Sequence, residues 1–321
     1  MKKILITGVA GFVGSHVAEA LLSRGYTVSG LDNFSQGNRY NIQSFIQHKN
    51  FCFYEGDVCD DHLIDQVSRD IDCVVHLAAF KIPRYGGATQ TLLINTRGTE
   101  NILAAARKYG HKILFSSTSD VYGKNPQHPF MEQSDLVLGT TTIGRWAYAV
   151  SKIYDEHLCF AYADEFRVPV VVVRYFGGYG PRQNLSWRGG PQSVFIDRAF
   201  KKQPLPIHGH GNQKRSFTFI SDLVAGTVAA IEKEEAVGHI FNIGNAQEIS
   251  IIELAKKIWR MVQKEDPVFE FIPYSNFSRN YEDIQRRVPD IQKAANILGY
   301  VPRIGLEEGL KRTVAWQKER A

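Results

Sequence analysis

The stretch that most constrains the fold lies near the start of the chain, where an apolar run meets three evenly spaced glycines. Residues 2–8, KKILITG, have the pattern of a buried β-strand, and GVAGFVG follows directly, from Gly8 through Gly11 to Gly14. Glycines at a strand-to-helix turn let a pyrophosphate approach the free N–H groups of the helix N-terminus. A glycine trio alone is weak evidence, but this one follows a strand and opens a helix. It therefore predicts a dinucleotide-binding turn.

An acidic residue ends the next predicted strand, TVSGLD, at Asp32. A carboxylate at this place binds the adenosine ribose hydroxyls and repels a 2′-phosphate. Asn33 and Phe34 add no positive charge, and Arg39 is a nearby cation that would oppose this preference. We therefore expect NAD rather than NADP, although the spacing is GxxGxxG rather than the GxGxxG of ordinary dehydrogenases.

Strand-like and helix-like patterns alternate through the first half of the chain. Strand patterns occupy 51–57, 72–79, 112–123 and 168–176, and long helix patterns occupy 91–110 and 147–166. The segment VPVVVVRYF is nearly all apolar, as expected of a parallel strand that is covered on both faces. This alternation predicts an α/β fold, with a Rossmann-type doubly wound parallel sheet over residues 1–176.

The pattern changes after residue 176. GGYGPRQNLSWRGGPQ is loop-like, and the helices and short strands that follow show no further regular βαβ series. We expect residues 177–321 to form a smaller mixed α/β domain that binds the substrate. Part of 217–244 is expected to return to the main sheet.

Composition excludes several classes of protein. The chain has 321 residues, is 44% hydrophobic and carries a net charge of +5 without a long basic run, so we expect no nucleic-acid partner. No segment approaches the ~20 apolar residues of a membrane span. The four cysteines form no CxxC pair, so we expect no metal site, no disulfide and a cytoplasmic location.

The segment GRWAYAVSK places Tyr148 and Lys152 four residues apart. On a helix, this spacing puts both side chains on one face. A single pair of this kind is often just part of an amphipathic helix, so its significance depends on the motifs around it.

Six motifs in order resemble the extended short-chain dehydrogenase/reductases that act on nucleotide sugars. They are GxxGxxG, HLAA (76–79), SSTSDVYG (116–123), YAVSK (148–152), RYFGGYGPR (174–182) and RSFTFISD (215–222). The family comprises NAD-dependent epimerases, dehydratases and decarboxylases, and the resemblance covers nearly the whole chain. It implies NAD as the cofactor, a nucleoside-diphosphate sugar as the substrate, and a homodimer formed through the helices near 92–109 and 148–166.

The resemblance also implies roles for individual residues. Tyr148 would be the base, with Lys152 and the nicotinamide charge bringing its pKa toward neutral, and Thr118 would bond the same sugar oxygen. The expected catalytic residues are Thr118, Ser119, Asp120, Tyr148, Lys152 and Arg287. The expected cofactor contacts are Gly8, Gly11, Phe12, Val13, Gly14, Asp32, Asn33, Asp57, Val58, Leu77, Ala78, Ala79, Lys81, Tyr148, Lys152 and Tyr175. The expected substrate contacts are Lys81, Thr118, Gly177, Arg182, Val194, Arg215 and Arg287, with Arg286 competing for the role of Arg287.

Oxidation at sugar C4 is the common first step in this family, and the resulting ketone has three fates. Return of the hydride to the other face gives a 4-epimerase, loss of a C6 carboxylate gives a decarboxylase, and loss of a C6 hydroxyl gives a dehydratase. UDP-glucuronate decarboxylases carry Thr-Ser-Glu at the strand end and a catalytic Arg near the C-terminus. This chain is similar, with TSD at 118–120 and RRVPDI at 286–291.

Three departures from the decarboxylase pattern are visible. Asp120 is one methylene shorter than Glu, Lys81 in FKIPRYGG (80–87) stands in a usually uncharged segment, and Gly177 replaces an Asn. The insert NLSWRGGPQ offers Trp187 and Arg188 as compensating contacts. We predict a UDP-sugar lyase that acts through a 4-keto intermediate, with decarboxylation of a UDP-hexuronate slightly ahead of 4,6-dehydration. A UDP-sugar 4-epimerase is the alternative, and a catalytically silent nucleotide-sugar sensor is a remote one.

Overall fold

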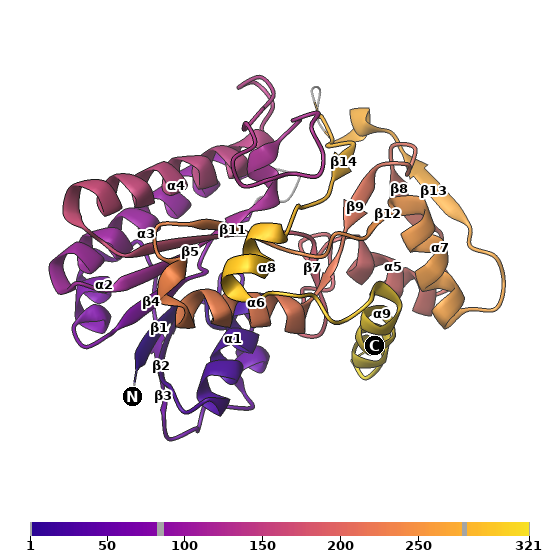
Figure 1. Cartoon of the computed structure of the whole chain (residues 1–321). Coiled ribbons are helices and arrows are strands. Elements are labelled where there is room, and N and C mark those ends of the chain that lie inside the picture. Colours follow the sequence, from indigo (N-terminus) through magenta and orange to yellow (C-terminus); the bar gives the residue numbers. More distant parts are fainter. Residues whose placement is uncertain (1, 82–86, 278–280, 321) are drawn as a thin grey trace.

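A seven-stranded parallel sheet forms the centre of the larger part of the molecule (Figure 1). The computed structural model of the chain describes residues 2–81, 87–277 and 281–320. The strand order is β11-β6-β5-β4-β1-β2-β3, and each neighbouring pair is parallel. These strands are β1 (Lys3–Thr7), β2 (Thr27–Asp32), β3 (Phe51–Glu55), β4 (Cys73–His76), β5 (Lys112–Thr118), β6 (Val170–Tyr175) and β11 (Ile240–Ile243).

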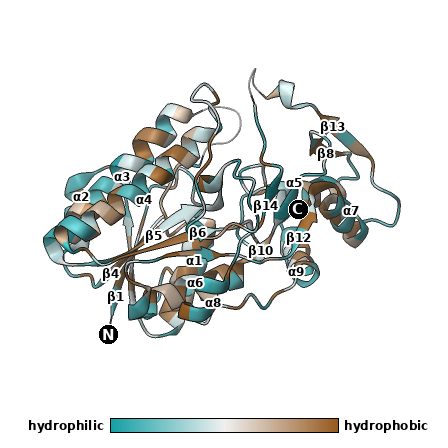
Figure 2. Ribbon diagram, turned by 45° about the horizontal axis from the view of Figure 1, so that its top comes forward, coloured by the Kyte–Doolittle hydropathy of each residue, from teal (hydrophilic) through white to brown (hydrophobic). Residues whose placement is uncertain are grey.

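Helices cover both faces of this sheet. One face carries α1 (Phe12–Ser23) and α6 (Ile220–Glu232), and the other carries α2 (Asp61–Ser68), α3 (Ala88–Tyr109) and α4 (Trp146–Phe166). Along β1, Ile4 and Ile6 join the core beneath α1 and α6, whereas Leu5 joins the core beneath α3. Apolar residues therefore fill both faces of the strands. In Figure 2, hydrophobic residues (brown) recur along the strands and along the helices beside them. The predicted doubly wound Rossmann-type sheet is confirmed.

The direction of winding changes between β4 and β1, which are neighbours in the sheet. From β1 the chain proceeds through β2 and β3 on one side, and β4 then starts the series on the other side. Such a switch point opens a crevice at the carboxyl ends of the strands, where open α/β sheets bind ligands. The strand ends at Thr7, Asp32, His76 and Thr118 lie at this edge.

The remaining elements form small sheets and helices beside that edge. They build one three-stranded mixed sheet, β12-β9-β14, and two strand pairs, β13-β8 and β10-β7. The strands are β7 (Gly178–Tyr179), β8 (Leu205–His208), β9 (Lys214–Ser216), β10 (Thr218–Phe219), β12 (Glu248–Ser250), β13 (Phe269–Ile272) and β14 (Arg286–Arg287). The helices are α5 (Pro191–Phe200), α7 (Ile251–Val262), α8 (Gln292–Leu298) and α9 (Leu306–Lys318). The short 3₁₀ turns within the described residues are η1 (Arg39–Ile42), η2 (Ser119–Tyr122), η3 (Glu234–Ala236) and η4 (Tyr274–Asn276).

Helix ends differ in a way that prepares the site. At the start of α7, Ser250 and Glu253 form a capping box, so the first backbone groups of that helix are satisfied. Helix α1 instead begins after Gly11, and no side chain of the described residues caps it. Its first N–H groups are therefore available to an anion. Separately, none of the helices within the described ranges is long and apolar enough to cross a membrane.

Candidate active site

The glycine turn brings the backbone of β1 and α1 close together. Gly8 has φ +73°, and a Cβ added there would lie 2.8 Å from the Ala78 nitrogen. A Cβ at Gly14 would lie 2.2 Å from the Gly8 carbonyl oxygen. A side chain at either position would therefore fill the space where the turn meets β4 and α1. The close approach of the backbone explains why glycines stand at these two positions.

Asp32 is fixed at the end of β2 by two backbone bonds. Its carboxylate accepts the Ala10 N–H at 2.9 Å and the Phe34 N–H at 2.8 Å. Burial raises the pKa of this carboxyl, and the two backbone bonds act against that rise. The neighbouring Arg39 lies over the Phe34 ring, 4.2 Å from its centre, and is paired with Glu55 at 2.6 Å.

Two cavities surround the glycine turn. One, of about 300 Å³, lies at the Asp32 side and is lined by predicted cofactor residues. These are Gly8, Gly11, Asp32, Asn33, Asp57, Val58, Leu77, Ala78 and Ala79. The other, of about 620 Å³, continues toward β5 and α4. Its lining includes predicted cofactor, substrate and catalytic residues, namely Phe12, Val13, Gly14, Lys81, Thr118, Ser119, Asp120, Tyr148, Tyr175, Gly177, Arg182 and Arg287.

The predicted base lies where β5 ends and α4 begins. Thr118 is the last residue of β5, and its hydroxyl accepts the Asp120 N–H at 3.2 Å. Tyr148 lines the large cavity, while Lys152, one turn later in α4, is buried with Nζ 4.5 Å from the centre of the Phe115 ring. Burial, reinforced by the charges of Asp120 and Asp155, raises the pKa of Tyr148, and a hydrogen bond with Thr118 opposes the rise. The protein chain by itself thus does not bring this phenol toward neutrality.

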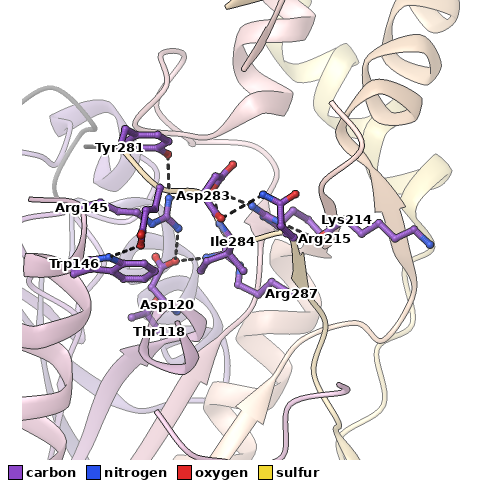
Figure 3. Close-up of polar contacts among 12 residues, drawn as sticks. Thr118, Asp120, Arg145, Trp146, Lys214, Arg215, Tyr281, Asp283, Ile284 and Arg287 are labelled. Atoms are coloured by element: carbon purple, nitrogen blue, oxygen red, sulfur yellow. Dashed lines mark hydrogen bonds and ion pairs between the residues drawn. The ribbon is translucent and has the colours of Figure 1, made fainter. Parts of the chain in front are cut away.

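A network of charged side chains surrounds Asp120 and Asp283 (Figure 3). Asp120 and Arg287 line the same cavities as Tyr148. Asp120 forms a salt bridge with Arg287 and lies 3.7 Å from Arg145. Asp283 accepts from Arg145 and from Arg215, each at 3.1 Å, and Tyr281 bonds Arg145 at 3.0 Å. Burial alone would raise the pKa of Asp120, but Arg287, Arg145, Lys81 and Arg215 together hold it below its usual range. Asp120 is therefore an ionised carboxylate held between arginines.

A further cavity of about 200 Å³ opens on the other side of this network. It shares Asp120, Tyr148 and Arg287 with the large cavity, so the base lies at the junction of the two. Its lining is rich in cations, namely Lys81, Arg145, Arg188, Arg215 and Arg287. Two aromatic rings, Trp187 and His208, stack within it with centres 4.1 Å apart. A pocket with several cations and a ring platform suits a phosphorylated ligand with a planar base.

The predicted substrate residues do not all line the cavities. Arg286 pairs with Glu248 at 2.7 Å, so Arg287 is the member of this pair that faces Asp120. Arg182 lines the large cavity and pairs with Glu19 at 2.8 Å. Val194 is 8% exposed within α5 and is not among the described residues that line these three cavities, because its helix turns it into the core. Of the segment 80–87, residues 82–86 lie outside the described residues.

Several site residues were not predicted from the sequence. Arg145 stands three residues before Tyr148, and this proximity on one helix is a local pattern that would have identified it. Asp283, which is 2% exposed, has no such local pattern. The large cavity is also lined by Tyr40, Trp316 and Arg320, and the Arg320 guanidinium lies 4.3 Å from the Tyr40 ring centre and 4.4 Å from that of Trp316.

A metal site would need several His, Cys, Asp or Glu side chains directed at one point. Across 2–81, 87–277 and 281–320, no group of three or more His, Cys, Asp and Glu side chains is arranged to hold a metal ion. The site thus offers a phenol, a hydroxyl, a carboxylate and several cations as its chemical groups.

Comparison with known proteins links this geometry to characterised ones. Residues 5–313 match the family model described as GDP-mannose 4,6 dehydratase. The UDP-N-acetyl-alpha-D-glucosaminuronate decarboxylase of Bacillus cytotoxicus is 37% identical over 321 residues, which is 99% of this chain and 98% of that protein. UDP-glucuronic acid decarboxylase 1 of Xenopus tropicalis is 38% identical over 317 residues, or 98% of this chain and 71% of that protein.

A solved structure is similar over the same length. The UDP-glucuronic acid 4-epimerase of Bacillus cereus, in complex with UDP-glucuronic acid and NAD, superposes with a TM-score of 0.90. It is 32% identical, and the match covers 99% of this chain and all of that one.

Proposed function

The chain belongs to the NAD-dependent nucleotide-sugar epimerase, dehydratase and decarboxylase family, and we propose that it removes CO₂ from a UDP-linked hexuronate. The observation that carries this proposal is the position of Arg287 and Arg145 against Asp120, beside Thr118 and Tyr148. A hexuronate brings a carboxylate to the reacting sugar, and arginines bind carboxylates through paired hydrogen bonds. Two relatives that match 98–99% of this chain are named as decarboxylases of such sugars.

The residues of the glycine turn fit NAD. Gly8 and Gly14 leave the space that a Cβ would fill. The Asp32 carboxylate stands at the strand end, where it could bond the hydroxyls of the adenosine ribose. Arg39 is already paired with Glu55, so no cation is directed at a 2′-phosphate from that residue. We therefore favour NAD over NADP. NAD, when bound, supplies the acceptor and later the donor of a hydride at sugar C4.

The protein side chains would do the proton chemistry. Tyr148 would take the proton of the C4 hydroxyl, and the Thr118 hydroxyl would orient the same oxygen. Because burial raises the pKa of Tyr148, its ionisation needs positive charge in the site, and Lys152 is the lysine one turn later in the same helix. Arg287 and Arg145 would hold the sugar carboxylate. Asp120, kept ionised by these arginines, would fix their orientation, and it would have to take up a proton from water before it could act as an acid on the sugar.

A UDP-sugar 4-epimerase is the second candidate, and one observation favours it. Asp120 is engaged by two arginines in the described structure, so it serves as a structural anion unless the substrate displaces it. An epimerase needs only Thr118, Tyr148 and Lys152. The similar solved structure is named as a UDP-glucuronic acid 4-epimerase. Dehydration of a sugar with a C6 hydroxyl ranks close behind decarboxylation, and a silent sensor is the remote case.

A turnover panel read by mass spectrometry tests the proposal. The purified protein and NAD would be incubated with UDP-glucuronate, UDP-N-acetylglucosaminuronate, UDP-glucose, UDP-N-acetylglucosamine and dTDP-glucose. Loss of CO₂ from a hexuronate is expected. Loss of water would indicate a dehydratase, and an altered sugar of unchanged mass would indicate the epimerase. Binding without any turnover would indicate the sensor.

Two arginines that are adjacent in the sequence provide a matched pair of variants. Arg287→Ala should abolish decarboxylation, because the carboxylate loses its partner beside Tyr148. Arg286→Ala changes an exposed arginine that pairs with Glu248, and it should leave turnover near the wild-type level. Equal activity of the two variants would contradict the assignment of Arg287.

We also propose a homodimer that forms through α3 and α4. These two helices pack against each other and expose Leu93 (64%), Val150 (44%) and Tyr154 (45%). Apolar side chains exposed on two adjacent helices are typical of a surface that a partner covers.

A further inference from the structure

A buried carboxylate that the proposed mechanism does not use lies one turn beyond Lys152. Tyr148, Lys152 and Asp155 are spaced four and three residues apart in α4, so their side chains share one helix face. Asp155 is 0% exposed and Lys152 is 1% exposed. Asp155 and Lys152 therefore interact away from water, where charges act on one another more strongly, and Tyr148 lies at the edge of the cavity.

Asp155 lacks the hydrogen bonds that usually accompany a buried carboxylate. Among the described residues, neither of its carboxylate oxygens has a hydrogen bond of good geometry; the Thr99 hydroxyl is near enough to favour the charged form, but it bonds His76 and the Asn95 carbonyl oxygen. An ionised carboxylate in this setting is unfavourable unless a cation compensates it. Lys152 is the cation that acts on Asp155, and Asp155 in turn is the strongest of the groups that favour the charged form of Lys152.

The adjacent Glu156 does not fill this role. Its carboxylate is bonded by Arg174 at 2.5 and 2.9 Å and by the Ser117 hydroxyl. Its charge is thus matched by a guanidinium on β6. Asp155 has no such guanidinium and is left to balance Lys152.

The other groups that face Asp155 come from three elements. Helix α3 contributes the Thr99 hydroxyl and Glu100, and α4 contributes Tyr148, Glu156 and Cys159. On β4, His76 bonds the Thr99 hydroxyl, and burial lowers its pKa to about 3, so it adds no positive charge near neutral pH. Lys152 is therefore the positive group among them.

We propose that Asp155 is the internal counter-charge that keeps Lys152 protonated in this dry site, so that its ammonium can stabilise the ionised Tyr148. This inference rests on the proposed function for the role of Tyr148, but the electrostatic effect of Asp155 on Lys152 does not. Burial lowers the pKa of Lys152, and without Asp155 it would fall further. Burial also raises the pKa of Asp155 to about 6, so the counter-charge is present above that pH and is lost below it.

The test measures the titration of Lys152 directly. Protein containing ¹³C-labelled lysine would be titrated by NMR in the NAD-bound state, with the Lys152 signal assigned from a Lys152→Met spectrum. Asp155→Asn should lower the midpoint of Lys152 by roughly one to two pH units, as expected for neighbouring charges at an effective dielectric constant of about 20. An unchanged midpoint would overturn the proposal, because a residue that only packs would not move it.

Two further variants provide an alternative to Asp155→Asn and a control for it. Asp155→Leu removes the same charge and fills the space with apolar atoms, so it should give the same shift if Asp155→Asn does not fold. Asp222→Asn changes a buried carboxyl of α6 that accepts the Ile304 N–H, and it should leave the Lys152 midpoint unchanged. A shift of similar size in that control would show that the effect is not specific to Asp155.

Turnover separates this inference from the proposed function. If a sugar of the panel reacts, the basic limb of its kcat profile should move to lower pH in Asp155→Asn by the same amount. The two profiles should converge below about pH 6, where the wild-type carboxyl takes up its proton. A shifted Lys152 midpoint without turnover of any sugar would refute the proposed function alone, and turnover with an unshifted midpoint would refute the counter-charge alone.

Discussion

The ion pair between Glu156 and Arg174 gives the sharpest stability prediction. It joins α4 to β6 with side chains that are 6% and 4% exposed, and it is bidentate, with N–O distances of 2.5 and 2.9 Å. Arg174 also donates to the Glu132 carbonyl oxygen at 3.0 Å. Replacing Glu156 by Gln removes the negative charge and leaves a guanidinium buried without compensation.

The expected loss follows from the burial of both partners. Breaking a buried pair on one side costs ~3–5 kcal/mol, because the remaining charge stays out of water. This is a large share of the ~5–15 kcal/mol that stabilises an ordinary domain. At ~2–4 °C per kcal/mol for chains of this order, the Tm should fall by roughly 10 °C. The double variant Glu156→Leu with Arg174→Met should recover most of the loss, since a well-packed apolar pair replaces the ionic one at little cost.

Urea unfolding followed by circular dichroism measures these differences. The control is Glu307→Gln, which breaks an exposed pair with Lys311 whose side chains are 59% and 60% exposed. That change should leave the free energy of unfolding close to the wild-type value, because solvent and salt screen an exposed pair. The reasoning is refuted if Glu156→Gln is as mild as the control, or if the double variant is no more stable than the single one.

Three further predictions concern the base, a buried histidine and the exposed helix face. Tyr148→Phe should lower kcat by ~10²–10⁴-fold while NAD still binds, as measured by turnover and by calorimetry; an active variant would exclude Tyr148 as the base. Burial lowers the pKa of His76 from 6.5 to about 3, so the unfolded chain binds more protons between these values and stability falls as pH falls through that window. Urea unfolding should show a loss of about 2 kcal/mol from His76 between pH 7.5 and pH 5, and His76→Gln should show a flatter pH dependence. Leu93→Asp should convert the proposed dimer to a monomer in analytical ultracentrifugation, and an unchanged mass would place any interface elsewhere.

Local sequence patterns predicted the features that a single turn or strand end determines. Gly8, Gly14 and Asp32 could be placed because a strand, a tight turn and a helix follow one another within a few residues. Thr118 and Tyr148 could be placed together because the resemblance links the end of one strand to the start of one helix. The doubly wound sheet followed from the alternation of apolar strands with long helices.

Contacts between segments that are far apart in the sequence could not be predicted from such local patterns. Arg145 and Asp283 are 138 residues apart, and no periodicity relates them. The burial of Val194 was missed because its helix orientation depends on the packing of α5, which no short motif records. The Asp120–Arg287 bridge was foreseen only as two separate candidates, since side-chain pairing across the cavity is a property of the assembled fold.

The position of β11 at the edge of the main sheet has a consequence for how the chain is made. Strand β6 ends at Tyr175, but the strand that pairs with its free edge ends at Ile243, about 70 residues later. At a synthesis rate of ~5–20 residues per second, that edge stays unpaired for roughly 3–14 seconds until β11 has been synthesised. Unpaired strand edges are templates for association with other chains. The nascent protein therefore exposes this edge to association with other chains during this interval, and a chain cut after residue 176 would lack the strand that covers it.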